Sequence, residues 1–213
     1  VEDPVERNLP RINQTQVNPT AGLTFEAGLR ALLRQDPDIL MVGETRDAET
    51  ASISVRAAIT GHMVFSTLHT NDALSSVVRL EDMGVERYMI ANSVAGLVAQ
   101  RLMRRVCPQC AKTVPVTEME RDLLDADITT VRRGTGCPSC NGTGYKGRIA
   151  IHELVVINKE MRRLISAGAT QEELTQTARR TQGMRSLRES AMELVRQGVT
   201  TPEELLKITY YED

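Results

Sequence analysis

Two apolar runs in this chain end directly on residues that could do chemistry. Ile39-Leu40-Met41-Val42 is followed by Gly43-Glu44, and Met63-Val64-Phe65-Ser66 is followed by a polar segment that contains His69. A short apolar run with turn residues behind it is typical of a buried strand in a parallel sheet, and ligands of open α/β sheets gather beyond the carboxyl ends of such strands. We therefore expect Glu44 and His69 to lie side by side on one rim. This pair predicts nucleotide hydrolysis, with Glu44 activating water and His69 sensing a phosphate.

Each of these side chains also has a plainer interpretation. Glu44 could form a simple salt bridge with Arg46, two residues further along. A lone histidine is more often a structural group than a catalytic one, but His62 and His69 flank the same expected strand. On sequence alone both interpretations of Glu44 stay open, and His62 and His69 are both candidates for the catalytic site.

Further charged residues could reach the same ligand. Arg30 and Arg34 lie four residues apart in an expected helix and share one face. Either they form a charged helix face that only contacts solvent, or their guanidinium groups contact phosphates, within one subunit or across a subunit boundary. Glu2, with Asp3 and Glu6 beside it, precedes Pro4 at what reads as another strand end. Acidic residues there often mark a solvated turn, although carboxylates can also orient water or hold magnesium.

All four cysteines fall into two Cys-x-x-Cys knuckles, Cys107 with Cys110 and Cys137 with Cys140. A two-residue gap lets both thiolates of a knuckle face one ion, and two knuckles complete a tetrahedron. Four thiolates leave no open coordination position, so we predict structural zinc. Disulfides are the alternative, but the rest of the chain resembles a cytosolic protein, in which thiols stay reduced.

Composition and charge exclude several classes of protein. The 213 residues permit one good core and a smaller annex, and 41% hydrophobic with 25% charged residues is ordinary for a soluble globular protein. A net charge of -2 and 3% aromatic residues without Trp argue against nucleic-acid binding. No apolar run approaches the roughly 20 residues of a membrane-spanning helix. The chain starts at Val1 without an initiator Met, so we expect it to be part of a longer protein.

Three consecutive parts of the chain differ in their residue pattern. Residues 1–106 alternate apolar strands with helical stretches, residues 107–145 are loop-rich and hold the cysteines, and residues 146–213 are a C-terminal helical region, clearest from about Asn158. Helices are expected at 48–59, from about residue 72 to Gly84, at 87–102 and near 119–124. Capping boxes that start helices are expected at Thr170, Ser186 and Thr201.

Several motifs occur together in a characteristic order. They are 1–6 (VEDPVE), 29–38 (LRALLRQDPD), 42–47 (VGETRD), 60–72 (TGHMVFSTLHTND), 100–102 (QRL), the two cysteine knuckles and 144–148 (GYKGR). In this combination the chain resembles the secretion ATPases of type II secretion and type IV pilus assembly (GspE/PilB-like), and the resemblance covers essentially its whole length. It implies a C-terminal part of such an ATPase: a partial RecA-like P-loop NTPase core in an α/β fold, a zinc-binding tetracysteine insert and C-terminal helices.

The resemblance also implies roles for individual residues. Residues 2–6 would be the acidic Asp box, with Glu2 as its catalytic-type glutamate. Residues 38–44 would be an atypical Walker B segment, with Gly43 where an aspartate often stands and Glu44 as the catalytic carboxylate. His62 and His69 would belong to the His box. Phosphate contacts would fall to four arginines, namely Arg30, Arg34, Arg46 and Arg148.

The family context implies partners as well. Its members work as hexameric rings in the cytoplasm, held at the inner face of the cytoplasmic membrane through platform proteins, and use ATP with Mg2+ to drive pseudopilin or pilin assembly. No nucleic-acid partner is expected. Related retraction ATPases usually lack the cysteine knuckles, so their presence favours the assembly or secretion branch.

One motif of the family is missing from this chain. No Walker A loop (G-x-x-x-x-G-K-[ST]) occurs in the 213 residues, so we expect this chain alone to bind ATP weakly or not at all. Two alternatives remain: a nucleic-acid translocase of related fold, such as a conjugation ATPase, and a zinc-stabilised scaffold without turnover.

Overall fold

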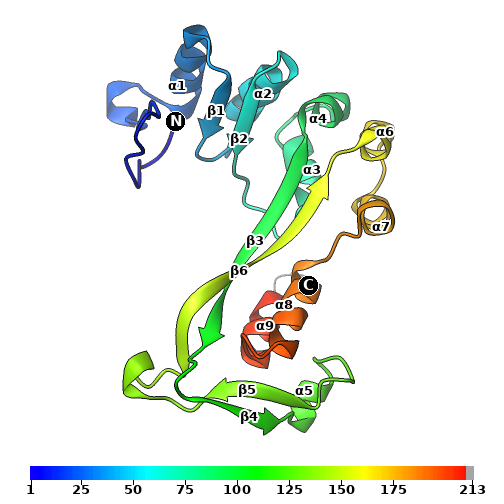
Figure 1. Ribbon diagram of the computed structural model, residues 1–213. Helices are drawn as coiled ribbons and strands as arrows, with labels where there is room; N and C mark the ends of the chain where they lie inside the picture. Colours follow the sequence, from blue (N-terminus) through cyan, green and yellow to red (C-terminus); the bar gives the residue numbers. More distant parts are fainter. Residues whose placement is uncertain (210–213) are drawn as a thin grey trace. The chain divides into compact units, whose positions relative to one another are not determined.

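The computed structural model describes residues 1–209, which adopt an α/β fold (Figure 1). The chain packs as two compact units, each made of separate segments. The first unit comprises Val1–Thr70, Leu74–Leu97 and Val156–Ala178. The second comprises Asn71–Ala73, Val98–Val155 and the chain from Arg179 on. The segments of the two packing units therefore alternate along the chain. The three parts expected from the residue pattern (1–106, 107–145 and 146–213) are instead consecutive.

The first unit contains the two neighbouring parallel strands that the apolar runs predict. β1 (Ile39–Val42) pairs with β2 (Met63–Ser66), in a register that joins Ile39 to Met63 and Val42 to Ser66. Both strands consequently end at the same edge of the sheet. The polar segments that follow them leave this edge next to one another.

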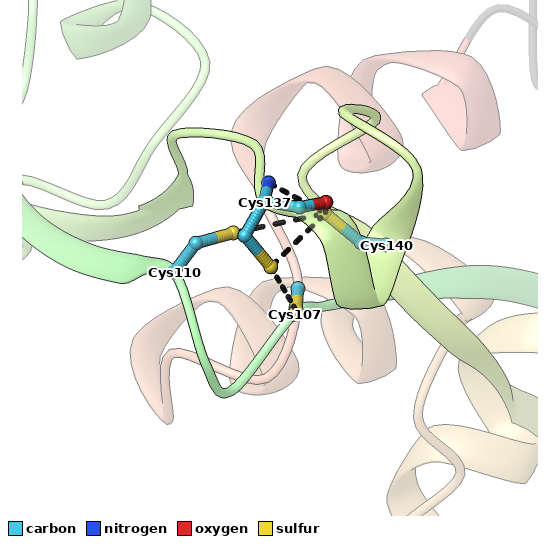
Figure 2. A group of neighbouring side chains, drawn as sticks. All are labelled: Cys107, Cys110, Cys137 and Cys140. Carbon is cyan, nitrogen blue, oxygen red and sulfur yellow. Dashed lines mark hydrogen bonds between the residues drawn. The ribbon is translucent and has the colours of Figure 1, made fainter.

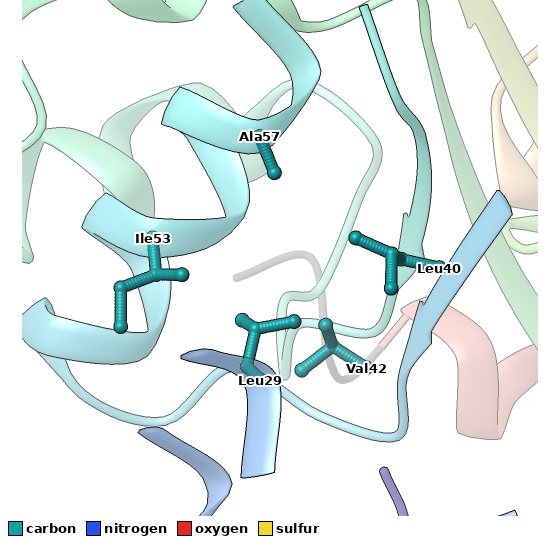
Figure 3. Packing of buried hydrophobic residues seen from close by; sticks show 5 residues of the cluster. All are labelled: Leu29, Leu40, Val42, Ile53 and Ala57. Carbon is teal, nitrogen blue, oxygen red and sulfur yellow. The ribbon is translucent and has the colours of Figure 1, made fainter. Parts of the chain in front are cut away.

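Only one face of this two-stranded sheet is buried. Leu40 and Val42 point into a core between the sheet and the helices α1 (Phe25–Leu32) and α2 (Ala48–Ile59). Figure 3 shows them packed with Leu29, Ile53 and Ala57. The alternating side chains on the other face are each more than half exposed, namely Ile39, Met41, Met63 and Phe65. The prediction of wholly buried strands is therefore wrong for these positions, because α1 and α2 cover one face.

The helices of the first unit largely follow the predicted limits. α2 occupies the predicted residues 48–59, and Asp47 caps it by accepting a 2.7 Å hydrogen bond from the Thr50 N–H. α3 (Ser75–Asp82) ends before Gly84 and buries Val77 and Leu80, whereas Val78 is 41% exposed. The other elements of this unit are η1 (Pro19–Ala21), η2 (Leu33–Gln35), α4 (Arg87–Ser93), α6 (Lys159–Ala167) and the first part of α7 (Gln171–Gln182).

The single helix predicted at 87–102 is wrong. The helix α4 ends at Ser93, and the strand β3 (Gly96–Val106) begins three residues later. From Leu97 to Ala99 buried and exposed residues alternate, as they do in a strand. A second strand, β6 (Tyr145–Val156), occupies the start of the region expected to be helical and pairs with β3. Short apolar stretches fit both periods, and this long-range pairing decides in favour of strands.

The second unit carries the cysteine-rich part of the chain. β4 (Ala111–Pro115) pairs antiparallel with β5 (Thr130–Gly134), and the short helix α5 (Glu118–Arg121) lies between them, as predicted near 119–124. The turn η3 (Pro138–Cys140) forms the second knuckle, and the helices α8 (Leu187–Arg196) and α9 (Pro202–Thr209) follow. None of the helices within residues 1–209 has the length and apolar character required to span a bilayer.

Two of the three predicted capping boxes form. The Thr170 N–H donates to Glu173 at 2.7 Å, and the Ser186 N–H donates to Glu189 at 2.8 Å. The third prediction is wrong, because the Glu204 carboxylate accepts hydrogen bonds from Arg104 instead. The hydroxyl of Thr201 correspondingly pairs with the Tyr145 hydroxyl at 2.8 Å.

Candidate functional site

The segments that follow β1 and β2 are joined by a set of short hydrogen bonds. The Thr67 hydroxyl donates to the Gly43 carbonyl at 2.7 Å, and the Thr45 N–H donates to the Thr67 carbonyl at 2.9 Å. The hydroxyls of Thr45 and Ser66 are 2.8 Å apart, and Thr45 is buried. These bonds extend the pairing of the strands beyond their ends and hold the two loops in one register.

This register brings together the two side chains that the sequence predicted to meet. His69 Nε2 lies 3.3 Å from Glu44 Oε2. The Glu44 side chain is 12% exposed and the His69 side chain 82% exposed, so the carboxylate lies beneath the imidazole at the rim. The Arg46 guanidinium donates to the same Oε2 atom. The salt bridge considered as the plainer alternative is thus present together with the histidine contact.

Its neighbours keep Glu44 ionised. The hydrogen bond from Arg46 is the largest cause that lowers the pKa of the Glu44 carboxyl, while partial burial raises it and the His69 contact lowers it further. The carboxyl is therefore a carboxylate at neutral pH. Oε1 of Glu44 has no hydrogen-bond partner among residues 1–209, so it is the oxygen that can accept a hydrogen bond from water.

Glu2 lies beside the same loop. Its backbone pairs with the segment around Gln16, and its Oε1 accepts a 2.8 Å hydrogen bond from Gln14. A Cβ atom on Gly43 would lie 3.2 Å from the Val1 carbonyl oxygen and 3.3 Å from the Glu2 Cα. A residue without a side chain at position 43 therefore lets the acidic N-terminal segment approach the end of β1.

The other predicted residues of the first unit lie apart from this rim. His62 precedes β2, whereas His69 follows it, and the His62 ring contacts the Ala57 carbonyl oxygen (3.0 Å) and the Thr60 hydroxyl (3.2 Å). Together with Arg30 and Arg34 it lines an open groove of about 810 Å3 along α2. Arg30 forms a 2.8 Å ion pair with Glu26. The α-helix ends at Leu32, so Arg34 lies in the turn η2.

The remaining predicted residues belong to the second unit. Arg148 is an exposed residue of β6. The four cysteine sulfur atoms lie within 4.8 Å of one another (Figure 2). Individual Sγ···Sγ distances are 3.9 Å for Cys107–Cys137, 3.8 Å for Cys110–Cys140 and 3.7 Å for Cys137–Cys140.

These distances fit a tetrahedral metal ion better than disulfides. Four ligands at a Zn–S bond length of about 2.3 Å are separated by about 3.8 Å at the corners of a tetrahedron. A disulfide requires sulfur atoms about 2.05 Å apart. The residues present thus fit a four-thiolate zinc site, and all four cysteines are free.

Backbone groups around the cysteines also favour a thiolate. Burial raises the pKa of the Cys140 thiol, but the N–H groups of Cys137 and Gly144, both 3.3 Å from its sulfur, outweigh burial and lower that pKa to about 6. Burial raises the pKa of Cys110 to about 11. A bound cation would be required to keep that second thiol deprotonated at neutral pH.

Two glycines permit the close backbone approach at this centre. A Cβ atom on Gly134, at the end of β5, would lie 2.0 Å from the Gly144 carbonyl oxygen. Gly144 has φ +77°, in the left-handed region that favours glycine. The spacing of the cysteines predicts the site, but only the folded chain reveals these backbone supports.

The chain belongs to the type II/IV secretion system protein family, whose model matches residues 1–207. The type IV pilus assembly ATPase PilB of Thermus thermophilus is 53% identical over 214 residues, which cover 98% of this chain and 24% of that protein. Type II secretion system protein HxcR of Pseudomonas aeruginosa is 51% identical (98% of this chain, 41% of that protein). Type II secretion system ATPase E of Vibrio cholerae is 46% identical (98% and 42%).

The chain therefore spans 24% to 42% of the length of these relatives. Two solved structures share its fold. They are the ATPase DotB of Legionella pneumophila (TM-score 0.63, 24% identity, 92% of this chain and 45% of that chain) and DotB of Yersinia pseudotuberculosis (TM-score 0.68, 19% identity, 99% and 48%). The family resemblance seen in the motifs is confirmed.

Sequence reasoning missed several residues of these sites. Thr45 and Thr67 join the two loops, and the signal was available, because each hydroxyl stands within three residues of an apolar run. Arg56 lines the groove of His62, but its position on α2 gave no indication of this. A local sequence pattern identifies a strand end, whereas it does not identify which helix side chains border the same groove.

Proposed function

We propose that this chain is the C-terminal portion of a hexameric secretion ATPase. In this proposal the complete protein hydrolyses ATP, with Mg2+, to drive pseudopilin or pilin assembly in type II secretion or type IV pilus biogenesis. The observation that carries it is the contact between His69 Nε2 and Glu44 Oε2 at the edge where β1 and β2 end. This is the edge at which open α/β sheets bind their ligands.

The geometry of the rim supports the catalytic roles that we assign. Glu44 accepts a hydrogen bond from the attacking water through Oε1, and Arg46 holds the carboxylate in place through Oε2. His69, largely exposed above Glu44, contacts the γ-phosphate. Glu2, next to Gly43, contributes a second carboxylate near the phosphates. A RecA-like core, completed by a Walker A segment elsewhere in the protein, provides the phosphate cradle.

The other predicted residues have roles outside this rim. Arg30, Arg34 and His62 line one groove without contacting Glu44 or His69, and we assign them to a boundary between subunits. Arg148, exposed on β6, is a candidate for phosphate contact from a neighbouring subunit. The cysteines hold structural zinc, which supplies folding free energy and no catalysis. The protein acts in the cytoplasm, at the inner face of the membrane through platform proteins.

The test is an ATPase assay on the complete protein that contains this chain. Glu44→Gln keeps the shape of the side chain but removes the carboxylate, so turnover should fall at least about a hundredfold while ATP binding is retained. Glu86→Gln, at an exposed position without an ion-pair partner in the described chain, is the matched control and should keep full activity. Undiminished hydrolysis by Glu44→Gln would reject Glu44 as the catalytic carboxylate.

A further inference from the structure

The backbone of Val1 pairs with β1 in the first unit. The Val1 nitrogen donates to the Met41 carbonyl oxygen at 2.8 Å, and the Gly43 N–H donates to the Val1 carbonyl oxygen at 2.8 Å. Bonds to the residues before and after one position of a neighbouring strand are the pattern of parallel pairing. Glu2, which follows Val1, therefore lies at the edge where β1 and β2 end.

The side chain of Gln14 holds the Glu2 carboxylate. Its Nε2 donates to Glu2 Oε1 at 2.8 Å and to the Arg7 carbonyl oxygen at 3.0 Å. Its Oε1 accepts from the Leu9 N–H at 2.8 Å. The reverse orientation of the amide would set its oxygen against two acceptors and its NH2 group against a donor. The hydrogen bonds therefore determine that the NH2 group faces Glu2.

This contact leaves the second carboxylate oxygen of Glu2 available. Oε2 of Glu2 has no hydrogen-bond partner among residues 1–209. Glu2 and Glu44 are thus alike, because a side chain holds each carboxylate through one oxygen and leaves the other to a ligand or water. The two donors differ in charge, since Arg46 is a cation and the Gln14 amide is neutral. Gln14 therefore fixes the direction of the Glu2 carboxylate without neutralising it.

We propose that Gln14 is a positioning residue for ATP hydrolysis, which directs the free oxygen of Glu2 to the ligand at the rim. The hydrogen bond orders the Glu2 side chain before ATP arrives, so less rotamer freedom is lost on the way to the transition state. Gln14 acts through Glu2 and contacts no reacting atom, so its loss lowers kcat more than it weakens ATP binding. This role rests on the proposed function, in which Glu2 contributes a carboxylate near the phosphates.

A second glutamine, Gln16, separates this role from a purely structural one. Its Oε1 accepts from the Val5 N–H at 3.2 Å, so it holds the same loop between Glu2 and Gln14. In the described chain its side chain forms no hydrogen bond with the Glu2 carboxylate. Loosening of the loop should follow from the loss of either glutamine side chain. A change in the direction of the Glu2 carboxylate should follow only from the loss of Gln14.

Steady-state ATPase kinetics of the complete protein that contains this chain test the role. Gln14→Met keeps the length of the side chain but removes its donors, so kcat should fall about tenfold while the KM for ATP changes less than about twofold. Gln16→Met is the matched control, and its kcat should stay within about twofold of the wild-type value. In the Glu2→Ala background, Gln14→Met should lower kcat no further, because no carboxylate is left to position. Single-turnover measurements resolve the slow rates of that background.

Three results would overturn the role of Gln14. They are a wild-type kcat in Gln14→Met, equal losses in the two glutamine variants, and an undiminished effect of Gln14→Met in the Glu2→Ala background. If Gln14→Met disturbs folding by circular dichroism, Gln14→Glu replaces it, since that carboxylate still accepts from the Leu9 N–H but donates nothing to Glu2. A fully active Gln14→Met beside an inactive Glu44→Gln would remove the role of Gln14 alone and leave the proposed function in place.

Discussion

Arg46 and His69 meet on a single atom, Oε2 of Glu44. The arginine comes from the loop after β1 and the histidine from the loop after β2, so one carboxylate oxygen links the two loops. The other oxygen of Glu44 is left to accept a hydrogen bond from a ligand or water. How strongly each neighbour acts on this carboxylate determines its proton affinity.

Removing the arginine should raise the pKa of Glu44 toward the ordinary glutamate value. The hydrogen bond from Arg46 is the main cause of its lowered pKa, and the His69 contact is a smaller one. Arg46→Ala should therefore shift the pKa upward more than His69→Ala does, as measured by NMR titration of the Glu44 side-chain carbonyl. A larger shift in His69→Ala would contradict this order of causes.

Glu204 should stabilise the second unit in a pH-dependent manner. Its side chain is 6% exposed and accepts from the Arg104 N–H at 2.8 Å and from Arg104 Nε at 2.9 Å. Burial raises the pKa of the Glu204 carboxyl, but the bonds from Arg104 and Lys207 outweigh it and lower that pKa. A lowered folded-state pKa means stability that is present above the ordinary glutamate pKa and lost as the pH falls through the folded value.

Glu204→Gln should thus lower the free energy of unfolding by about 1–3 kcal/mol at neutral pH. The loss should shrink in acid, because the wild-type carboxylate is then protonated. Urea unfolding at several pH values measures both effects. Lys207→Ala removes a partner that is 58% exposed and should cost less than about 1 kcal/mol. An equal loss in the two variants would show that the Arg104 bonds add nothing.

Removing one thiolate should destabilise the cysteine centre. Cys107→Ser should lower the zinc content and the free energy of unfolding by about 3 kcal/mol or more, because metal binding is coupled to folding. For a chain of this size the melting temperature should fall by roughly 6–12 °C. Ser139→Ala, in the second knuckle but not a ligand, is the control. Absence of metal from the wild-type protein by elemental analysis would refute the zinc assignment.

A methyl group at Gly134 should disturb the same centre through the backbone. Its Cβ would lie 2.0 Å from the Gly144 carbonyl oxygen, so the two segments must move apart. Gly134→Ala should cost about 3 kcal/mol and reduce zinc retention during dialysis against a chelator. Gly142 has φ +75° but open space around its Cβ position, so Gly142→Ala should cost only about 1 kcal/mol and keep the metal. Equal zinc retention in both variants would contradict the close-approach argument.

Adjacent residues of β1 should respond very differently to truncation. Leu40 is 3% exposed in the core with Leu29 and Ile53, so Leu40→Ala should cost about 2–5 kcal/mol. Ile39 is 64% exposed on the opposite face, and Ile39→Ala should cost less than about 1 kcal/mol. Denaturant unfolding of both variants compares the two faces. Similar losses would mean that both faces are covered in solution.

The sequence by itself determined the features that depend on residues close together in the chain. The cysteine spacing, the polar residues after the apolar runs, the limits of α2 and the meeting of Glu44 with His69 all follow from neighbouring residues and the rule that parallel strands end at one edge. Tertiary structure alone decided that β3 and β6 are strands and that Glu204 binds Arg104. Each of these depends on a partner far away in the chain, and a local pattern of apolar and charged residues is compatible with more than one such partner.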